Sequence, residues 1–260
     1  MPSVSWLSIA PVKGLALVHA DQVDLGPAGV GENRRFYLVE ETGRQFGLLR
    51  NGRLVQIRPD YDAGTERLAL HLPDGSIVDG EVEVGESIEA PFVGGRTVSG
   101  RLVVGPWSDA ISAHARRPLR LVKTDRPGDG VDRGRGHVSL VSDASVDEIG
   151  RQGGREDVDA RRFRMLVGVG GCEPHEEDEW VGRQIRIGEA VVLLRGHVAR
   201  CAITTQNPDS GVPDFDTLRT IKAYRGLRDG GLDFGVYGEV VEPGRVRLGD
   251  PVEPLEAALF

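Results

Sequence analysis

The first 105 residues break into short runs rich in Val, Leu and Ile, separated by turn residues. The runs are Ser5–Ile9, Leu15–Leu25, Arg35–Glu40, Arg53–Asp60, Arg67–Leu72, Ser76–Val84 and Thr97–Val104. Pro73-Asp74-Gly75 between two of them is a hairpin signal. The chain contains 36 glycines in 260 residues, which is about twice the average usage and suits many tight turns. This pattern predicts a β-barrel or sandwich and disfavours a helical bundle.

The rest of the chain mixes strand and helix patterns, so the fold class we predict is α/β and β-rich. Helices are expected over Ser108–Arg117, from Ser142 or Asp143 to Gln152, and over Thr217–Tyr224. Strands are expected over Leu119–Thr124, Phe163–Val169, Ile185–Leu194 and Arg200–Thr205, with a last hairpin formed by Phe234–Val241 and Arg245–Leu248. The Gly-, Asp- and Arg-rich stretch Asp125–Gly136 predicts a loop between two modules.

Composition excludes several classes of protein. The net charge of −8 argues against nucleic acid as a partner. Two cysteines are too few for a four-cysteine zinc site, an iron–sulfur cluster with four cysteine ligands or a disulfide framework. No apolar run approaches the roughly 18 residues of a membrane span, and the N-terminus has no signal-peptide pattern. We therefore expect a cytoplasmic protein that does not bind membranes.

Cys201 is the first candidate for chemistry. It follows Arg200 and precedes two threonines and the turn Asn207-Pro208-Asp209-Ser210-Gly211. A neighbouring arginine can lower a thiol pKa, and the thiolate is both the nucleophile and the metal ligand. The alternative is a buried structural cysteine, which is the commonest role of a free cysteine. Local chemistry leaves both open. For Cys172, beside an acidic run, a solvated loop is the favoured interpretation.

Cationic residues form the second set of candidates. Lysine occurs only at Lys13, Lys123 and Lys222, and Lys13 stands at a turn after the first predicted strand. Arg34-Arg35 and Arg161–Arg164 are basic groups in an acidic chain. Guanidinium groups can bind a phosphate or carboxylate bidentately. Each group can equally be ordinary surface charge, and the residues alone do not decide between the two.

Several segments, taken in order, resemble the MOSC superfamily, named after the C-terminal domain of molybdenum cofactor sulfurase. The branch that they resemble most contains the mitochondrial amidoxime reducing components. The segments are residues 8–14 and 33–39 in the first half, and 138–145, 161–164, 177–180, 200–211, 217–225, 234–237 and 248–252 in the second. The most specific signal is Arg-Cys-x-x-Thr-Thr-x-x-Pro-Asp-Ser-Gly at residues 200–211, followed by Leu-x-x-x-Lys-x-Tyr-Arg.

The resemblance implies a MOSC-type β-barrel with peripheral helices at residues 119–260, after an N-terminal β-barrel module at residues 1–118. It implies a pterin–dithiolene molybdenum cofactor whose metal is bound by Cys201. A soft thiolate suits such a centre. The cofactor-binding residues that it implies are Lys13, Arg34 and Arg164 for the terminal phosphate, with Ser142, Arg200 and Tyr237 around the site.

Four positions depart from the family pattern, because Gly14, Val141, Leu166 and Ala199 stand where polar residues are usual. By analogy with the family, the expected activity is a molybdenum-dependent oxidoreductase that removes or transfers oxygen at a small N-hydroxylated substrate. The chain lacks cysteines for an iron–sulfur cluster and a recognisable flavin motif, so a separate electron-donor protein is expected. Two alternatives stay open: a sulfur carrier with a persulfide on Cys201, and a cofactor-free enzyme in the same fold.

Overall fold

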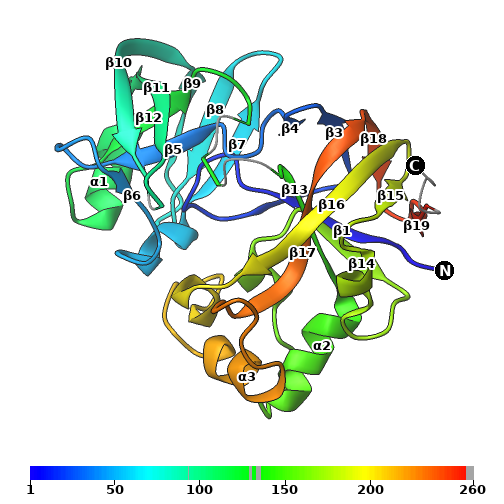
Figure 1. Ribbon diagram of the computed structural model, residues 1–260. Coiled ribbons are helices and arrows are strands. Elements are labelled where there is room, and N and C mark those ends of the chain that lie inside the picture. The colour runs from blue at the N-terminus through cyan, green and yellow to red at the C-terminus, as the bar shows by residue number, and fades with distance from the viewer. Residues whose placement is uncertain (93, 129–130, 133–135, 256–260) are drawn as a thin grey trace.

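The computed structural model describes residues 1–92, 94–128, 131–132 and 136–255 (Figure 1). Its strands are β1 (Ser3–Ile9), β2 (Val18–Ala20), β3 (Gln22–Gly26), β4 (Gly29–Val30), β5 (Phe36–Val39), β6 (Gln45–Phe46), β7 (Arg58–Asp62), β8 (Arg67–His71), β9 (Ile77–Glu81), β10 (Glu83–Pro91), β11 (Thr97–Val104), β12 (Arg120–Thr124), β13 (Val138–Ser142), β14 (Val167–Gly170), β15 (Gln184–Ile187), β16 (Ala190–Ala199), β17 (Asp233–Glu242), β18 (Gly244–Arg247) and β19 (Val252–Pro254). The α-helices are α1 (Trp107–Ala115), α2 (Asp143–Gln152) and α3 (Thr217–Tyr224). Four 3₁₀ turns are η1 (Gly52–Gln56), η2 (Ala160–Phe163), η3 (Glu176–Trp180) and η4 (Ala202–Thr205). The predicted β-rich class is confirmed.

The largest sheet has eight strands in the order β19-β15-β16-β17-β13-β14-β1-β2. Its pairs are antiparallel except β13 with β14, which is the parallel pair. Helices α2 and α3 lie below this sheet in Figure 1, and its long strands β16 and β17 run diagonally in that view. Its two end strands are β19 and β2, so this sheet of described residues is open and does not close into a full hydrogen-bonded barrel.

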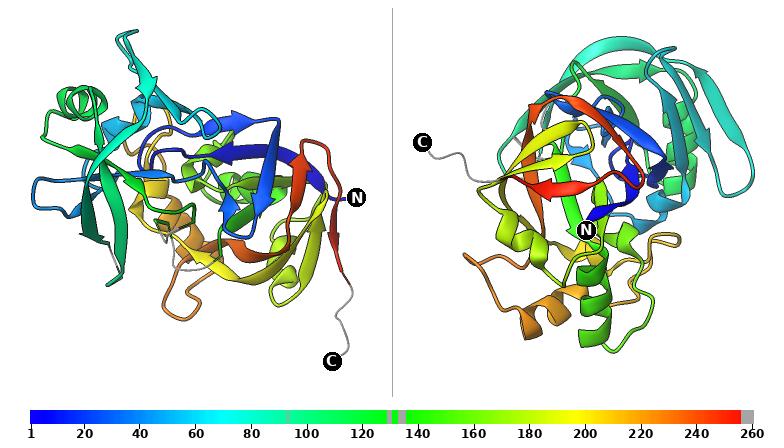
Figure 2. Two further views of the ribbon diagram at one scale, coloured as in Figure 1. Left: turned by 90° about the horizontal axis from the view of Figure 1, so that it is seen from above. Right: turned by 90° about the vertical axis from the view of Figure 1, so that its right-hand side faces the viewer.

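A second lobe is built from the first half of the chain (Figure 2). It contains a five-stranded sheet, β10-β11-β12-β5-β6, and a three-stranded sheet, β7-β8-β9. The hairpin predicted at Pro73-Asp74-Gly75 is confirmed, because β8 and β9 pair antiparallel around it. A third small sheet, β18-β3-β4, joins the C-terminal part of the chain to the N-terminal part.

The sheets do not follow the division of the sequence at residue 118. Strand β12 lies in the five-stranded sheet of the first half, between β11 and β5. Strand β1 pairs with β14 from the second half, and β3 pairs with β18. The two lobes therefore exchange strands, and the boundary at 118/119 stays a prediction. Part of the predicted loop Asp125–Gly136, residues 129–130 and 133–135, lies outside the described residues.

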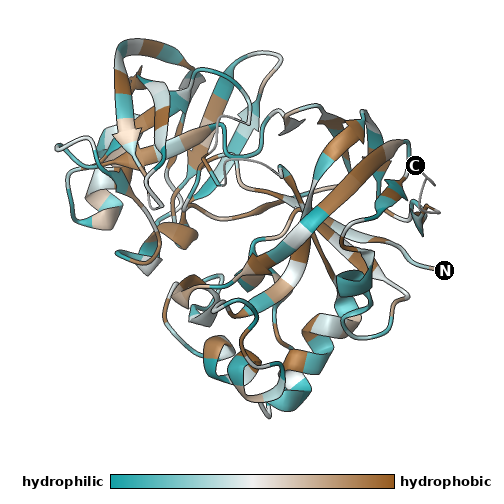
Figure 3. Ribbon diagram, viewed as in Figure 1, coloured by the Kyte–Doolittle hydropathy of each residue, from teal (hydrophilic) through white to brown (hydrophobic). Residues whose placement is uncertain are grey.

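Each lobe has its own core, which is almost entirely aliphatic in the eight-stranded sheet and also contains aromatic residues in the first lobe. The core of the eight-stranded sheet includes Leu7, Leu140, Val192 and Val236, each 2 % exposed or less. The core of the first lobe includes Phe36, Leu54 and Leu121. Hydrophobic residues are concentrated along the strands, and the outer faces of the helices are polar (Figure 3). Burial of these aliphatic side chains is the main force that holds the sheets together.

Seven predicted elements were wrong in part. The predicted strand Leu15–Leu25 is divided into β2 and β3, and the predicted strand Ser76–Val84 is divided between β9 and β10. The predicted strand Arg53–Asp60 begins only at Arg58, because residues 53–56 belong to η1. The side chain of Asn51 caps this turn by accepting from the N–H of Arg53. Where the strand Arg200–Thr205 was predicted, residues 202–205 form η4. The predicted strand Ile185–Leu194 lies in the hairpin β15–β16. The predicted strand Phe163–Val169 begins only at Val167. The predicted last hairpin is absent because β18 pairs with β3 and not with β17.

The three predicted helices are confirmed within two residues of their predicted ends, and Ser142 is the predicted cap of α2. Helix α2 begins after Ser142, whose hydroxyl accepts from the N–H of Ser145. Helix α3 begins after Asp216, which accepts from the N–H of Arg219. Over the residues that the structure describes, no helix is both long enough and apolar enough to cross a membrane.

Candidate functional site

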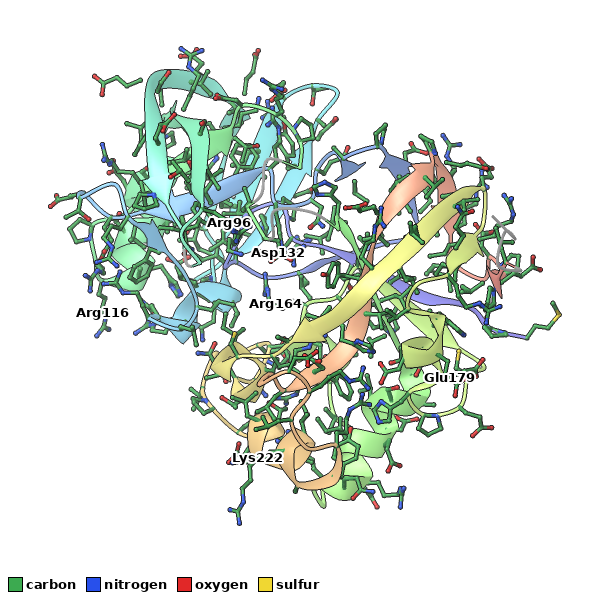
Figure 4. The ribbon with its side chains drawn as sticks, viewed as in Figure 1. Arg96, Arg116, Asp132, Arg164, Glu179 and Lys222 are labelled. Atoms are coloured by element: carbon green, nitrogen blue, oxygen red, sulfur yellow. The ribbon has the colours of Figure 1, made fainter. Side chains whose placement is uncertain are left out.

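Two cations from distant parts of the chain, Lys13 and Arg34, hold one carboxylate, and the charge of a third cation, Arg164, acts on the same group. Lys13 Nζ and Arg34 Nε each lie 3.3 Å from Oδ1 of Asp132. Arg34 also donates to the backbone carbonyl of Arg164 at 3.1 Å, and Arg164 donates to the carbonyl of Leu15 at 2.8 Å. Figure 4 shows Asp132 and Arg164 near the centre of the molecule, between the two lobes. We call Lys13, Arg34 and Arg164 the cation cluster.

Local backbone structure fixes these three residues. The segment that carries Lys13 is held against the start of β5, because Lys13 N donates to the carbonyl of Phe36. Arg34 and Arg164 both adopt left-handed backbone conformations, with φ of 55° and 53°. Non-glycine residues rarely adopt this conformation, and those that do often lie at functional sites. The left-handed backbone at two of the three cations sets the direction in which their side chains leave the chain, which points to a functional reason for this conformation.

The cluster concentrates positive charge in a half-buried place. The Lys13 side chain is 25 % exposed and that of Arg34 is 13 % exposed. Burial lowers the pKa of Lys13, and the charges of Arg34 and Arg164 lower it further, whereas Asp132 opposes the change. Burial is also the largest cause of a lowered Arg164 pKa, followed by the charge of Arg34. Burial and neighbouring positive charges disfavour the charged forms of these side chains, and a bound anion would stabilise the charged forms.

Cys201 lies at the N-terminal end of η4, and its side chain is exposed. Its backbone carbonyl accepts from both the N–H and the hydroxyl of Thr204, at 3.1 Å each, which fixes the turn behind the thiol. The other cysteine, Cys172, is half-buried, and burial raises the pKa of its thiol to about 12. In the described part of the chain, no group of three or more His, Cys, Asp or Glu residues is arranged to hold a metal ion.

Arg200 connects Cys201 to the cation cluster. Its guanidinium donates to the carbonyl of Phe163 at 2.8 Å and contacts the sulfur of Met165 at 2.9 Å. These two residues flank Arg164 in the sequence. The same side chain donates to the carbonyl of Phe234 in β17. Arg200 therefore ties the backbone beside the thiol to the backbone that carries a cluster cation, which is a structural contribution to the predicted site.

The other arginines of the basic run hold the loop that follows Cys201. Arg161 forms a two-pronged pair with Asp209, at 2.8 and 2.9 Å, and also binds Asp159. Arg162, whose side chain is fully buried, donates to the carbonyls of Thr204 and Gln206. The basic run of the sequence thus divides into two loop-holding residues and one cluster cation.

A surface pocket joins Arg164 to the Cys201 segment. It is lined by Leu48 and Val55 of the first lobe and by Arg164, Ile203 and Gln206 of the second. Ile203 lies two residues after Cys201, on η4. A second pocket is lined by Arg34, Asp132, His137 and Ser139. Each of the two pockets is thus lined by one cation of the cluster, Arg164 in the first and Arg34 in the second.

Two predicted site residues have other surroundings. Ser142 is completely buried, and its hydroxyl lies 2.7 Å from that of Ser145 in the cap of α2. It lines neither pocket. Tyr237 in β17 is half-buried, and Gly136 packs against its ring so closely that a Cβ there would lie 2.3 Å from Cδ2. A role of either residue toward a ligand stays a prediction.

The structure explains part of the departures from the family pattern. Val141 and Leu166 are buried in hydrophobic cores, at 0 % and 1 % exposure. Gly14 has a φ of +94°, a conformation that a side chain at this position would strain. Ala199, at the end of β16, is exposed. Three of the four positions thus have a structural reason for lacking a polar side chain.

Asp132 is the site residue that the sequence did not reveal. It lies in the Gly- and Asp-rich stretch, where several acidic residues look alike. No motif or spacing distinguishes it from its neighbours, because its position depends on the packing of the two lobes. The only signal was the basic surroundings of Lys13 and Arg34, which need a counter-charge.

Comparisons with known proteins agree with this architecture. A model of the MOSC N-terminal beta barrel domain matches residues 1–98, and a model of the MOSC domain matches residues 128–253. The chain is 26 % identical over 282 residues to mitochondrial amidoxime-reducing component 1 of Xenopus laevis, covering 96 % of this chain and 81 % of that protein.

A second relative matches a shorter region. The chain is 33 % identical over 123 residues to mitochondrial amidoxime reducing component 2 of Rattus norvegicus, and this match covers 44 % of the chain but only 36 % of that protein. Among solved structures, the YUAD protein of Bacillus subtilis superposes with a TM-score of 0.47 at 16 % identity, covering 98 % of this chain and 96 % of that one. The two domain models together span most of the chain, in the order that the resemblance implied. The chain therefore belongs to the MOSC family, with a MOSC N-terminal beta barrel domain ahead of its MOSC domain.

Proposed function

We propose that this protein is an oxidoreductase that binds the molybdenum cofactor, with Cys201 as the protein ligand to the metal. The observation that carries the proposal is the convergence of Lys13 and Arg34 on one anion position, with Arg164 beside them in a pocket that also reaches the segment after the exposed Cys201 thiol. A phosphorylated pterin needs fixed cations at one end and a soft donor at the other. The relation to amidoxime-reducing components supports the same function.

The residues present fit such a group in two respects. The Cys201 thiol is exposed and held on a tight turn, and thiolates are favoured ligands of soft transition metals. The cation cluster already holds a carboxylate, so it is competent to hold an anion. Arg200 links the backbone at Cys201 to the two neighbours of Arg164, Phe163 and Met165. When bound, the cofactor would supply a metal that exchanges two electrons.

The reaction that we propose is the reduction of an N-hydroxylated small molecule. The N–O bond breaks, two electrons and two protons enter, and the products are the N–H compound and water. The electrons come from a separate donor protein. The pocket beside η4 offers the apolar side chains of Leu48, Val55 and Ile203 to the body of a substrate, and the amides of Gln206 and Asn207 to its polar end. Its location at the junction of the lobes suits a small molecule.

Elemental analysis tests the proposal directly. The full chain, expressed in a host that makes the cofactor, is expected to contain about one molybdenum per molecule, and Cys201→Ala is expected to lose it. Cys172→Ala is the matched control, since Cys172 is half-buried with a strongly raised pKa. The proposal is wrong if the wild-type chain carries no molybdenum, or if Cys201→Ala retains it.

One other function is favoured by the exposure of Cys201, namely transfer of sulfur as a persulfide. An accessible thiol beside Arg200 is suited to that chemistry too. Intact mass spectrometry separates the two functions. A sulfur adduct of about 32 Da that is removed by a reductant and lost in Cys201→Ala favours the carrier, whereas a released pterin favours the oxidoreductase.

A further inference from the structure

The anion position of the cation cluster is occupied by the protein itself. Asp132 Oδ1 lies 3.3 Å from both Lys13 Nζ and Arg34 Nε, and its backbone carbonyl accepts from Arg96 at 3.1 Å. Figure 4 shows Arg96, Asp132 and Arg164 close together. The Asp132 side chain is 33 % exposed. The carboxylate is thus held by two cations but remains in contact with solvent. An anion from the solvent can therefore reach the two cations and displace it.

The charge balance of the cluster makes this contact significant. Three cations and one carboxylate leave a net charge of about +2, so the site still attracts anions when Asp132 is in place. A free monoanion of the same chemistry, such as acetate, would gain no more from Lys13 and Arg34 than Asp132 does. It would also lose translational freedom, which the tethered side chain does not. A ligand must therefore carry more charge than a carboxylate to occupy the position.

We propose that Asp132 is an internal competitor for the anion position, and that it reserves Lys13 and Arg34 for a phosphate dianion by excluding small monoanions. This inference rests on the proposed function for the identity of the natural ligand, but not for the existence of the competition. It makes Asp132 a specificity-determining residue of the site. The apparent affinity of the site for any anion is lowered in proportion to the time that Asp132 occupies it.

A different role of Asp132 makes the opposite prediction. If Asp132 were only a counter-ion that holds the cations in place, its removal would let Lys13 and Arg34 repel each other. The site would then lose its shape, and anions would bind more weakly. Competition and counter-ion support both lower the stability of the empty protein on removal of Asp132, but they change anion affinity in opposite directions. Affinity is therefore the measurement that separates them.

The experiment measures inorganic phosphate and acetate binding at pH 8 by calorimetry, on the full chain prepared without cofactor. Asp132→Asn is expected to bind phosphate about tenfold more tightly than the wild type and to bind acetate measurably. Asp125→Asn is the matched control, because it makes the same charge change at an exposed position near the same loop. It should leave phosphate affinity unchanged. Asp132→Ala is a second variant should Asp132→Asn fold poorly.

Two results would overturn the inference. Equal or weaker phosphate binding by both Asp132 variants would show that the carboxylate supports the site and does not compete for it. Undiminished phosphate binding in Lys13→Gln would show that the cluster is not the anion site at all. Neither measurement involves molybdenum. Loss of the proposed function, seen as absence of metal in the wild-type chain, would therefore leave the result on Asp132 standing, and the reverse also holds.

Discussion

Gly52 and Gly211 meet backbone to backbone across the junction of the two lobes. A Cβ built on Gly52 would lie 2.0 Å from the carbonyl oxygen of Gly211, and a Cβ on Gly211 would lie 2.0 Å from that of Gly52. Gly211 ends the loop that follows Cys201, and Gly52 begins η1 of the first lobe. Close by, Gln206 donates to the carbonyl of Leu48 at 3.1 Å. The first lobe therefore contacts the loop after the candidate metal ligand directly.

The contact predicts that Gly52→Ala will destabilise the protein. The added methyl group overlaps backbone atoms that cannot rotate away, so the lobes must separate locally. We expect a loss of about 1–3 kcal/mol in the free energy of unfolding, measured by urea denaturation. Gly31→Ala is the control, because no atom lies within 4 Å of a Cβ there. Equal stability of the two variants would contradict the rigidity of the junction.

Arg162→Met is expected to destabilise the loop after Cys201 much more than Arg155→Met. Both guanidinium groups bind Asp214 and lie over the ring of Phe215. Arg162 alone is fully buried and also binds two carbonyls of the Cys201 loop. Its removal leaves buried acceptors without a donor, at a cost of about 3 kcal/mol. The 35 % exposed Arg155 should cost about 1 kcal/mol or less. Urea midpoints compare them, and similar losses would refute the assignment.

Turns and helix starts could be predicted from the sequence because the residues that determine them are neighbours in the chain. The Pro73-Asp74-Gly75 hairpin and the cap at Ser142 depend on neighbouring residues only, and the structure has them. The pairing of strands between the two lobes could not be predicted from the sequence. Pairing of β3 with β18 joins residues more than 200 positions apart, and no local pattern encodes it. The turn after Cys201 was missed because hydroxyl groups of Thr204 and Thr205 close it onto backbone carbonyls.

The candidate site shows the same division. Lys13 and Arg34 were identified by resemblance, and the structure brings them together with Arg164. The basic run at 161–164 read as one group of cations. The structure separates it, because Asp209 and Asp214 neutralise Arg161 and Arg162 from about 50 residues away. Tertiary pairing of this kind decides which charges remain for a ligand, and residue spacing does not show it.

The two cysteines are expected to differ strongly in reactivity. Burial, with the charges of Glu176 and Glu177, raises the pKa of Cys172 to about 12, so only about one thiol in ten thousand is ionised at pH 8. Cys201 is exposed. Iodoacetamide at pH 8 should therefore modify Cys201 first, as seen by peptide mass spectrometry. Cys201→Ala should leave almost no fast-reacting thiol. Fast modification of Cys172 in the folded protein would contradict the burial that raises its pKa.

The lowered pKa of Lys13 predicts that anion binding weakens with rising pH earlier than an ordinary lysine would allow. Sulfate is a suitable probe because its charge is constant across this range. As the pH rises through the pKa of Lys13, which lies below the ordinary value of 10.5, the cluster loses one cation and sulfate affinity falls. Calorimetric titrations from pH 7 to pH 10 would follow this fall.

The stability of the ligand-free protein is expected to change with pH in the opposite direction. Between the lowered pKa of Lys13 and 10.5, the unfolded chain holds a proton on this lysine that the folded chain has released, so the free energy of unfolding rises with pH. Lys13→Met removes this contribution and serves as the reference in urea titrations at each pH. Lys13→Arg keeps its charge to higher pH, so its sulfate affinity should fall less steeply than that of the wild type. An identical pH profile for sulfate binding in the wild type and Lys13→Arg would show that Lys13 does not govern the site.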